Sequence, residues 1–365
     1  MHNRGPLAAI ARDSMRIGMI VNHDVFNIAY RALRPAEALR KRGHEVEVVV
    51  QQPDGTLDPR PLHHCDVVHV YRRADVVVRH HTDQLRARGI ALTWDNDDDL
   101  RRAPPASKRR VGYSSYGAER DFVLQMMMLR RADVVTTTSE MLAEVYRRAG
   151  AACVRPIENY LGSEQYSRAI RLHEGLVIGW VAGHEHEADA NALGIHDVLR
   201  RVMARHDRVQ VVSVGLALRD LDEGRYFRHR LVPHAELHNV LRGLDIGIAP
   251  IADIPMSYLR SNVKVKEYAA VGTPWIASNR GPYVGLGERQ GGLLVDDGEW
   301  EQALDRLIRS RMLRLRLRRR AAAWARTQSI DRHADQWISV FDEAIRRARE
   351  RAGAPHTSRS STVRR

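Results

Sequence analysis

Short apolar runs alternate with longer amphipathic stretches through the first half of the chain. Four helical patterns, over 35–42, 74–88 and 118–131 and from Ser139 onward, separate these runs. A strand, helix, strand order is typical of a parallel sheet built from βαβ units. The first half is therefore predicted to hold one parallel sheet of five or six strands, at residues 16–22, 45–50, 66–71, 90–94, 133–138 and 153–157.

The second half repeats the alternation after a polar stretch, 158–175, that we interpret as an interdomain linker. Strands are predicted at 176–181, 209–214, 226–231, 245–250, 275–277 and 293–295. Helices are predicted at 190–204, at 263–271 and over most of the chain from about 300 to 349. The pattern predicts an α/β protein of two Rossmann-like parallel-sheet domains facing across a cleft. The predicted units are a flexible extension (1–14), an N-terminal domain (15–165), a C-terminal domain (166–330), a final helix (331–350) and a disordered basic tail (351–365).

Length and composition restrict the class of protein. The chain of 365 residues is long enough for two ordinary domains. No apolar run approaches the roughly 18 residues needed to cross a bilayer. The N-terminus lacks the hydrophobic core and cleavage site of a signal peptide. Only Cys65 and Cys153 are present, which fits a reducing cytoplasm and excludes a Cys-rich zinc module.

The formal net charge of +13 favours an anionic partner. Seven of the twelve residues 309–320 are Arg, and Met312, Leu313, Leu315 and Leu317 lie between them. This is a basic amphipathic helix, which is either a solvated helix face or a peripheral contact with an acidic membrane. No aromatic-rich RNA motif or helix-turn-helix pattern accompanies it, so no nucleic-acid partner is expected.

Polar residues follow two predicted strands of the first half. Sites in parallel sheets lie at the carboxyl ends of strands, which places Asn22, His23 and Asp24 on the rim of a crevice. The strand 90–94 ends in a run of acids, of which Asp95, Asp97 and Asp98 are candidate ligand contacts. Clustered carboxylates suit Mg²⁺ or Mn²⁺. The alternatives are hydrogen bonding to substrate or a polar start to the next loop and helix, and the segment 101–117 is predicted to be a mobile loop beside this cleft.

In the second half, the strand 176–181 leads into a turn that contains Gly183, His184, His186 and Asp189. Gly183 permits close approach of the backbone to a ligand, and His186 or Asp189 can form hydrogen bonds to it. The spacing does not give HExxH, so a zincin-type site is not expected. The dinucleotide fingerprint GxGxxG is also absent.

The most informative stretch is 256–283, MSYLRSNVKVKEYAAVGTPWIASNRGPY. It predicts a helix from Asn262 or Val263 to about 271, ended by a glycine and followed by a strand. Ser261 or Asn262 is expected to cap the helix, whose N-terminus is then an anion site. Lys264 and Glu267 share one helical face, whereas Lys266 lies well around the helix.

Lysine is rare in this chain, which strengthens the prediction. Of 58 basic residues only four are lysines, and two of them are Lys264 and Lys266. A compact ammonium differs physically from a guanidinium, so its presence here indicates a chemical requirement, such as a phosphate. The alternative is two solvated helix charges that occur together by chance.

Four segments carry a resemblance to a known family: RPAEALRKRGHEVEVV, ADVVTTTSEML, PIENYL and DIGIAP…SNVKVKEYAAVGTPWIAS. Together they resemble the group 1, family 4-like retaining glycosyltransferases of the GT-B fold, in a subgroup with an SNxKxxEY-type helix. The similarity extends from Met15 to about Arg349. The last segment is fairly specific, and the earlier ones occur in many doubly wound proteins.

The resemblance implies transfer of a hexosyl or related sugar from a nucleotide-sugar to an acceptor hydroxyl, with retention of anomeric configuration and no required metal or cofactor. The acceptor would be a polysaccharide, a glycolipid or a natural product on the first domain. Glu267 matches the family's second motif glutamate, which binds the nucleotide ribose. The first, which contacts the sugar, falls at Leu259. The family's Arg and Lys pair is replaced by His184 and His186, which leaves Lys264 and the helix N-terminus to neutralise the diphosphate.

These interpretations assign candidate residues to the two sides of the cleft, in a cytoplasmic protein that could bind the inner membrane face. The final helix is expected to cross back onto the first domain. A nucleotide-sugar epimerase and a degenerate, non-catalytic binding protein are the alternatives on this fold. Candidate catalytic residues are Lys264, Glu267 and His186. Donor contacts are expected from Gly183, His184, Ser261, Asn262, Val263, Lys264 and Glu267. Acceptor contacts are expected from Asn22, His23, Asp24, Asp95, Asp97 and Asp98.

Overall fold

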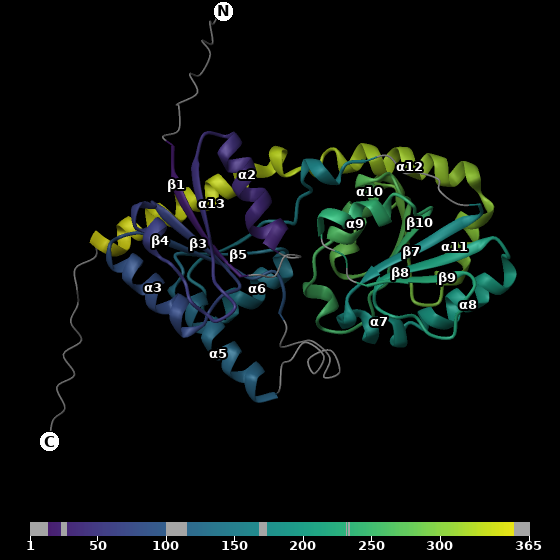
Figure 1. Ribbon diagram of the computed structural model, residues 1–365, viewed down its shortest axis with the longest axis horizontal. Helices are drawn as coiled ribbons and strands as arrows, with labels where there is room; N and C mark the ends of the chain where they lie inside the picture. Colours follow the sequence, from purple (N-terminus) through teal and green to yellow (C-terminus); the bar gives the residue numbers. More distant parts are fainter. Residues whose placement is uncertain are drawn as a thin grey trace, which may run out of the picture.

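A computed structural model describes residues 14–22, 28–99, 115–167, 174–230, 232 and 234–353. It contains two six-stranded sheets that lie side by side, each with helices on both faces (Figure 1). Within the described residues, every pair of neighbouring strands in the two sheets is parallel. The predicted α/β fold with two parallel-sheet halves is confirmed.

The first sheet has the strand order β2-β1-β3-β4-β5-β6, with the first strand next to the centre. In the strands at 67–71, 91–95 and 134–137 every side chain is buried, as expected for the centre of a sheet covered on both faces. Its strands are β1 (Arg16–Val21), β2 (Glu45–Val50), β3 (Val67–Tyr71), β4 (Ala91–Asp95), β5 (Val134–Thr137) and β6 (Val154–Pro156). All six match predicted strands to within about two residues.

Helices cover the two faces of the first sheet as two separate apolar clusters. One cluster contains residues of α2 (Arg34–Lys41) and the C-terminal helix. The other contains residues of α3 (Val76–Ala87), α5 (Ser115–Arg131) and α6 (Glu140–Arg148). The predicted start of α6 is confirmed, since the Ser139 hydroxyl accepts a hydrogen bond from the backbone N–H of Leu142 at 3.2 Å.

The second sheet has the order β12-β11-β10-β7-β8-β9. Its centre is made by the apolar strands β7 and β10, which pack against helices on both sides. The strands are β7 (Leu176–Ala182), β8 (Val209–Gly215), β9 (Tyr226–His229), β10 (Ile246–Ala249), β11 (Trp275–Ser278) and β12 (Gly292–Val295).

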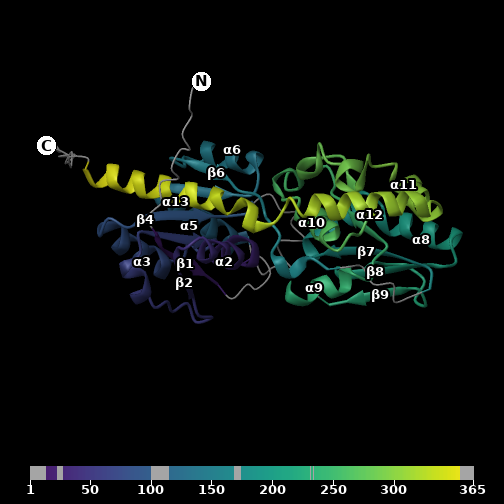
Figure 2. The same ribbon diagram turned by 90° about the horizontal axis from the view of Figure 1, so that it is seen from above.

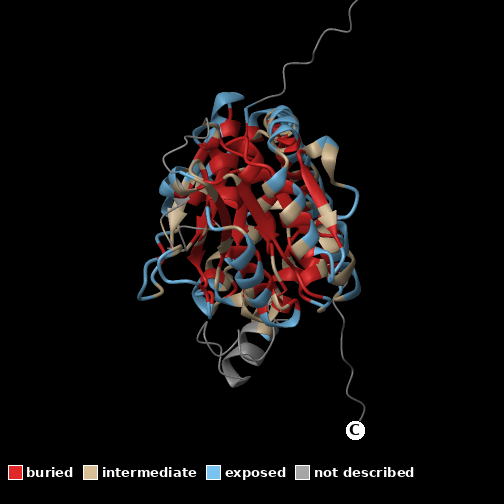
Figure 3. Ribbon diagram, turned by 90° about the vertical axis from the view of Figure 1, so that its right-hand side faces the viewer, coloured by how far each residue is buried: buried red, intermediate tan, exposed pale blue. Residues whose placement is uncertain are grey.

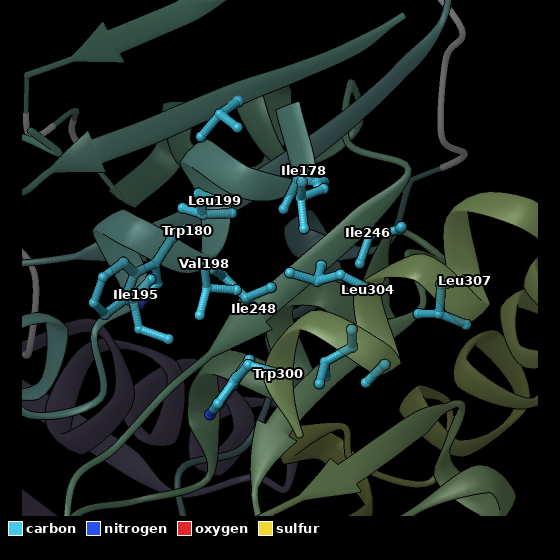
Figure 4. Packing of buried hydrophobic residues seen from close by; sticks show 14 of the residues in the cluster. Ile178, Trp180, Ile195, Val198, Leu199, Ile246, Ile248, Trp300, Leu304 and Leu307 are labelled. Atoms are coloured by element: carbon cyan, nitrogen blue, oxygen red, sulfur yellow. The ribbon is translucent and has the colours of Figure 1, made fainter. Parts of the chain in front are cut away.

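Ile178, Trp180 and Trp300 lie in the main core of this half, together with leucines and isoleucines of the covering helices (Figure 4). Two details differ from the predictions. The expected helix 190–204 is two helices, because Gly194 at φ +59° interrupts it. One short helix was not predicted. The helices are α7 (Glu187–Ala192), α8 (Ile195–Arg205), the unpredicted α9 (His234–Leu241), α10 (Val263–Ala270), α11 (Trp300–Arg309) and α12 (Arg311–Ala325).

The C-terminal helix α13 (Ile330–Gly353) leaves the second half and packs across the first (Figure 2). Trp337 and Phe341 are fully buried in the cluster that includes α2. The buried apolar stripe repeats along the helix at the spacing expected for one helical face. The predicted return of the final helix to the first sheet is confirmed.

The chain passes between the two halves twice, and the two passages touch. The backbone N–H of Leu161 donates to the carbonyl of Gln328 at 2.8 Å, and the N–H of Ile330 donates to the carbonyl of Leu161 at 2.8 Å. Leu161 and Ser329 therefore form a parallel bridge. The connection between the halves is a short hydrogen-bonded ribbon rather than two independent linkers.

Residues 311–320 of the arginine-rich segment lie in α12, and two of its arginines form ion pairs. Leu313 and Leu317 are buried, whereas Met312 is 75% exposed. Arg316 and Arg320 both form ion pairs with Glu288. Exposed positions form one side of this helix, and buried positions face the interior, as the burial colouring illustrates for the whole molecule (Figure 3). Among the described residues, no helix combines the length and apolar character needed to span a bilayer.

Candidate active site between the two sheets

A cavity of about 320 Å³ lies between the two halves, at the carboxyl ends of strands from both sheets. Ligands bind at this end of parallel α/β sheets, and the volume is within the range of small-molecule sites. The cavity is lined from the first half by Tyr30, Asp97, Asp98 and Asn159, and from the second half by Val181, Gly183, Glu185, His186, Leu237, Met256, Arg260, Ser261, Val263, Lys264, Glu267 and Tyr283.

Helix α10 places its N-terminal turn against this cavity. The helix ends before Gly272, at φ +75°, and β11 follows, as predicted. The predicted side-chain cap is wrong, because Asn262 is the N-cap residue but makes no cap hydrogen bond. Its amide donates instead to Glu158 at 3.3 Å, and the Ser261 hydroxyl accepts from Asn159 at 3.3 Å. Both side chains are turned toward the passage between the halves, so the helix N-terminus is left for other partners.

Lys264 and Glu267 line the cavity together, as their spacing predicts. Lys264 is half-buried, and its ammonium makes no hydrogen bond or ion pair with any residue in the described ranges. Burial lowers the pKa of Lys264, although the Glu185 and Glu267 carboxylates act in the opposite direction. A cation that is partly desolvated and has no ionic partner is suited to bind an anion.

Glu267 already has a partner from the other half. The Tyr30 hydroxyl donates to the Glu267 carboxylate at 2.5 Å, and Gln165 donates to the Tyr30 oxygen at 2.8 Å. Tyr30 and Glu267 are 5% and 6% exposed. This contact joins the first sheet's side of the cavity directly to α10.

Lys266 is fully buried on a different side of α10 from Lys264, which confirms that the two lysines face different surroundings. Its ammonium donates to the Glu158 carboxylate at 2.6 Å and to the Asn159 carbonyl at 3.0 Å. It also lies 4.6 Å from the centroid of the Tyr160 ring. Lys266 therefore binds α10 to the first passage between the halves.

The turn after β7 brings His186 into the cavity wall. Its ring contacts the Asp189 carboxylate at 2.8 Å and the Arg260 guanidinium at 2.6 Å. Burial lowers the pKa of His186 to about 4, so the imidazole is neutral near pH 7. Asp189 is fully buried and also accepts from the backbone N–H of Ala252 at 2.8 Å, which fixes the loop that precedes α10. The predicted donor residue His184 is exposed and does not line the cavity.

Arg260 was not predicted, and it is the second cation of the cavity. It is 8% exposed and donates to Asp189 at 3.1 Å in addition to its contact with His186. Through His186, Arg260 lies against the turn after β7, where the resemblance would have placed an Arg and Lys pair. In the sequence, Arg260 stands directly before Ser261 and thus next to the predicted anion site. Spacing does not determine the direction in which a loop side chain points, so its place in the cavity wall was not predicted.

On the first half, Asp97 and Asp98 line the cavity, as predicted. Arg72, which has an unusual left-handed backbone at φ +57°, forms ion pairs with Asp97 at 2.6 Å and with Asp98 at 2.8 Å. The Tyr71 hydroxyl also donates to Asp97 at 3.0 Å. Burial raises the pKa of Asp98 to about 6 despite the nearby Arg72 charge. Asp98 is only partly buried, whereas Asp97 is buried, so Asp98 is the more accessible of the two from the cavity.

Other predicted acceptor residues do not reach the cavity. Asp95 is fully buried in an ion pair with Arg31 at 2.5 Å, so the prediction that it faces the acceptor is wrong. It also accepts from the Thr136 hydroxyl at 2.5 Å, and this network satisfies the carboxylate inside the sheet edge. Asn22 does not line the cavity. His23 and Asp24 lie outside the described residues, as does most of the predicted loop 101–117.

Leu259, at the position of the motif's first glutamate, is turned away from the cavity. It ends the short 3₁₀ helix η6 (Ser257–Leu259), is 5% exposed and packs in the apolar cluster of the first half with Leu142 and Tyr146. An ionised glutamate here would be buried among apolar side chains at a high cost. Leucine at this position stabilises the contact between the halves.

The described residues contain no group of three or more His, Cys, Asp or Glu side chains able to hold a metal ion. Asp97 and Asp98 are instead neutralised by Arg72. The acidic run therefore forms ion pairs in the described part of the chain.

Comparisons with known proteins give a fold but no family. No family model matches the sequence. No curated protein matches it either.

Many solved structures do match, with 418 matching chains. A glycosyltransferase from Rickettsia africae ESF-5 is 14% identical, with a TM-score of 0.63 over 91% of this chain and 99% of that chain. HepE of Anabaena, solved in complex with UDP-glucose, is 17% identical, with a TM-score of 0.60 over 89% and 98%. Sucrose-phosphate synthase of Thermosynechococcus elongatus is 16% identical, with a TM-score of 0.57 over 90% and 98%. The chain therefore has the two-sheet GT-B fold that these structures share.

Proposed function

We propose that this protein is a glycosyltransferase that moves a sugar from a nucleotide-sugar to an acceptor hydroxyl with retention of configuration. The observation that carries the proposal is the Lys264 ammonium beside the N-terminus of α10, which has no hydrogen-bond or ion-pair partner among the described residues. Glu267 lies one turn further along the same cavity wall. The fold is also that of HepE, whose solved complexes contain UDP and UDP-glucose.

In this proposal the donor nucleotide binds to the second half. The diphosphate would contact Lys264 and the backbone of Ser261 to Val263, where the positive end of the helix dipole lies. Arg260 adds positive charge to the same wall, although Asp189 partly balances it. Glu267 would accept hydrogen bonds from the ribose. Gly183 allows the backbone after β7 to approach the ligand closely.

Departure of the nucleotide places negative charge on its terminal phosphate. Prepositioned N–H groups and a desolvated ammonium stabilise this charge in the transition state, and such groups commonly supply a large part of catalysis. The sugar fragment acquires oxocarbenium-like character and needs a shaped pocket more than a side-chain nucleophile. We propose that the acceptor attacks on the face from which the phosphate leaves, and that the phosphate accepts its proton.

The neutral His186 directs its Nδ1–H to Asp189, so it would position the sugar as a hydrogen-bond acceptor at Nε2. On the opposite wall, Asp98 would accept a hydrogen bond from the acceptor hydroxyl. The acceptor is proposed to be a sugar, a lipid-linked sugar or a small molecule. No step of this scheme requires a bound metal.

A donor panel tests the proposal. UDP-, GDP-, ADP- and dTDP-linked sugars would be screened by thermal shift, and each would then be incubated with a pool of acceptors and examined by mass spectrometry. We expect one class of donor to raise the melting temperature and to be consumed with a gain of one sugar mass on an acceptor. A binding protein without activity would show the thermal shift alone, and an epimerase would convert the donor sugar without transfer. Absence of any shift and any turnover would exclude the transferase.

We also propose that the exposed side of α12 contacts an acidic membrane, and that this membrane carries the acceptor. Arg311, Met312 and Arg319 are exposed on this helix. An Arg311→Glu, Arg319→Glu variant should lose co-sedimentation with vesicles containing anionic phosphatidylglycerol. Equal sedimentation of the variant and the wild type would exclude this surface as the membrane contact.

A further inference from the structure

Tyr30 reaches the cavity from an irregular part of the first half. It lies in η1 (Ala29–Leu33), a π-helical turn that continues directly into α2. Such turns are rare and often occur at functional sites. Its neighbour Arg31 is fully buried, pairs with Asp95 and donates to the Ile157 carbonyl at 2.5 Å. Arg31 thereby anchors the turn to the first sheet, while Tyr30 contacts α10.

The direction of the Tyr30 hydrogen bonds is determined by their partners. Gln165 donates through its amide nitrogen, so the Tyr30 oxygen accepts that bond. The hydroxyl proton is then directed to the Glu267 carboxylate, since the structure pairs these two groups at 2.5 Å. Burial raises the pKa of Tyr30 well above its usual value, so the hydroxyl keeps its proton. Tyr30 thus offers Glu267 the same group as a ribose, a hydroxyl that donates.

This inference rests on the proposed function. We propose that the Tyr30 hydroxyl and a ribose hydroxyl compete for the Glu267 carboxylate, so that nucleotide binding exchanges one hydroxyl donor for the other. The two vicinal hydroxyls of a ribose would together use both oxygens of the Glu267 carboxylate. The Tyr30 hydroxyl is already bonded to one of these oxygens, Oε1. Because both side chains are almost fully buried, the ribose gains this oxygen only when Tyr30 withdraws.

The exchange acts on the contact between the two halves. Tyr30 belongs to the first half and Glu267 to the second, and they are 237 positions apart in the sequence. The bonds of Lys266 to Glu158 and of Asn159 to Ser261 lie outside the exchange and continue to join the halves. Nucleotide binding therefore loosens one specific contact across the cavity, and part of the binding free energy is used to break it.

Tyr30→Phe tests the competition, because it keeps the ring and removes the hydroxyl. Calorimetric titration would first identify which of UDP, GDP and ADP the wild type binds, and would then compare that nucleotide with its 2′,3′-dideoxy form. We expect the variant to bind the ribonucleotide about two- to tenfold more tightly, the equivalent of one net hydrogen bond. Affinity for the dideoxy form should be unchanged. Tyr166→Phe is a matched control, since its hydroxyl donates to the Ala325 carbonyl at 2.8 Å and does not line the cavity.

Equal or weaker binding of the ribonucleotide by folded Tyr30→Phe would overturn the competition, and so would an equal gain for the dideoxy form. If the wild type binds none of these nucleotides and none of the sugar nucleotides of the donor panel, the proposed function fails instead, so the two failures are distinguishable. A crystal structure of the wild type with the bound nucleotide provides a check that needs no variant. We expect a separation beyond 3.5 Å between the Tyr30 oxygen and Glu267, and a retained bond between them would contradict the proposal.

Discussion

Lys264 and Lys266 are two positions apart on one eight-residue helix, and their surroundings are opposite. Lys264 is half-buried in the cavity wall and has no ionic or hydrogen-bonding partner in the described ranges. Lys266 is fully buried and bonded to Glu158 and to a backbone carbonyl. The first lysine is arranged for a ligand, and the second is arranged for the fold. Residue type and spacing alone do not separate these two roles.

The largest expected effect comes from Lys264→Ala. Removal of a group that stabilises developing charge typically costs about 10²- to 10³-fold in kcat, and the variant should fold normally because no bond is lost. Steady-state kinetics with the identified donor and a melting curve measure the two properties. Lys264→Arg, which keeps the charge in a different shape, should recover only part of the activity. Turnover within a few-fold of wild type would show that Lys264 does not bind the phosphate.

Glu267→Gln should have the next largest effect, on nucleotide affinity. The exchange replaces charge-assisted hydrogen bonds to the ribose by neutral ones, so we expect roughly tenfold weaker binding. Calorimetric titration measures it, and Glu288→Gln is the control, because Glu288 pairs with Arg316 and Arg320 and does not line the cavity. An unchanged dissociation constant would show that Glu267 does not meet the ribose.

Lys266→Ala should affect stability more than chemistry. The substitution removes the buried ammonium that donates to the Asn159 carbonyl and to the Glu158 carboxylate. Because Glu158 is half-exposed and can be solvated by water, the loss of stability is limited. We expect a loss of about 1–3 kcal/mol in the free energy of unfolding, measured by urea denaturation, and a smaller fall in turnover than for Lys264→Ala. If Lys264→Ala destabilises the protein as much as Lys266→Ala, the contrast between the two lysines is wrong.

Asp98→Asn should give the smallest effect and a characteristic pH dependence. Burial raises the pKa of Asp98 to about 6, above its ordinary value, so the folded state holds this proton more tightly than the unfolded chain. Stability is therefore lost as the pH rises from about 4 through 6. The asparagine variant should be more stable than the wild type at pH 7.5 and nearly equal to it at pH 4, while its acceptor KM rises. A variant less stable at pH 7.5 would mean that the Arg72 ion pair outweighs burial.

Most of the fold could be predicted from the sequence. Buried parallel strands appear as short apolar runs, and amphipathic helices appear as a regular helical spacing of apolar residues. Ser139 as a cap and Gly272 as a terminator were likewise local signals. The break at Gly194 and the short α9 were missed. The break depends on the backbone angle of one residue, and α9 is only eight residues long. A hydrophobic pattern that is judged over a longer window does not resolve features of this size.

The site was predictable only where it is local. Lys264 and Glu267 share a face by helical geometry, and the structure places both in one cavity. Tyr30, Arg260 and the true surroundings of Asp95 could not be inferred in the same way. Tyr30 meets a residue 237 positions away, and Asp95 is satisfied by Arg31, 64 positions earlier. The pair of Tyr30 and Glu267 is set by how the two halves are placed, and the pair of Arg31 and Asp95 by how η1 packs on the first sheet. A single sequence contains no record of either arrangement.

The bridge between Leu161 and Ser329 has a mechanical consequence. Two separate linkers would leave the halves free to translate, bend and rotate about one another. Because the two passages are hydrogen-bonded to each other, rotation about the long axis would break the bond between the Leu161 N–H and the Gln328 carbonyl. We expect bending across the ribbon to preserve that bond, so that opening of the cavity follows mainly one angle. A single pair of fluorescent labels, one on each half, should then report the whole opening coordinate of the cavity.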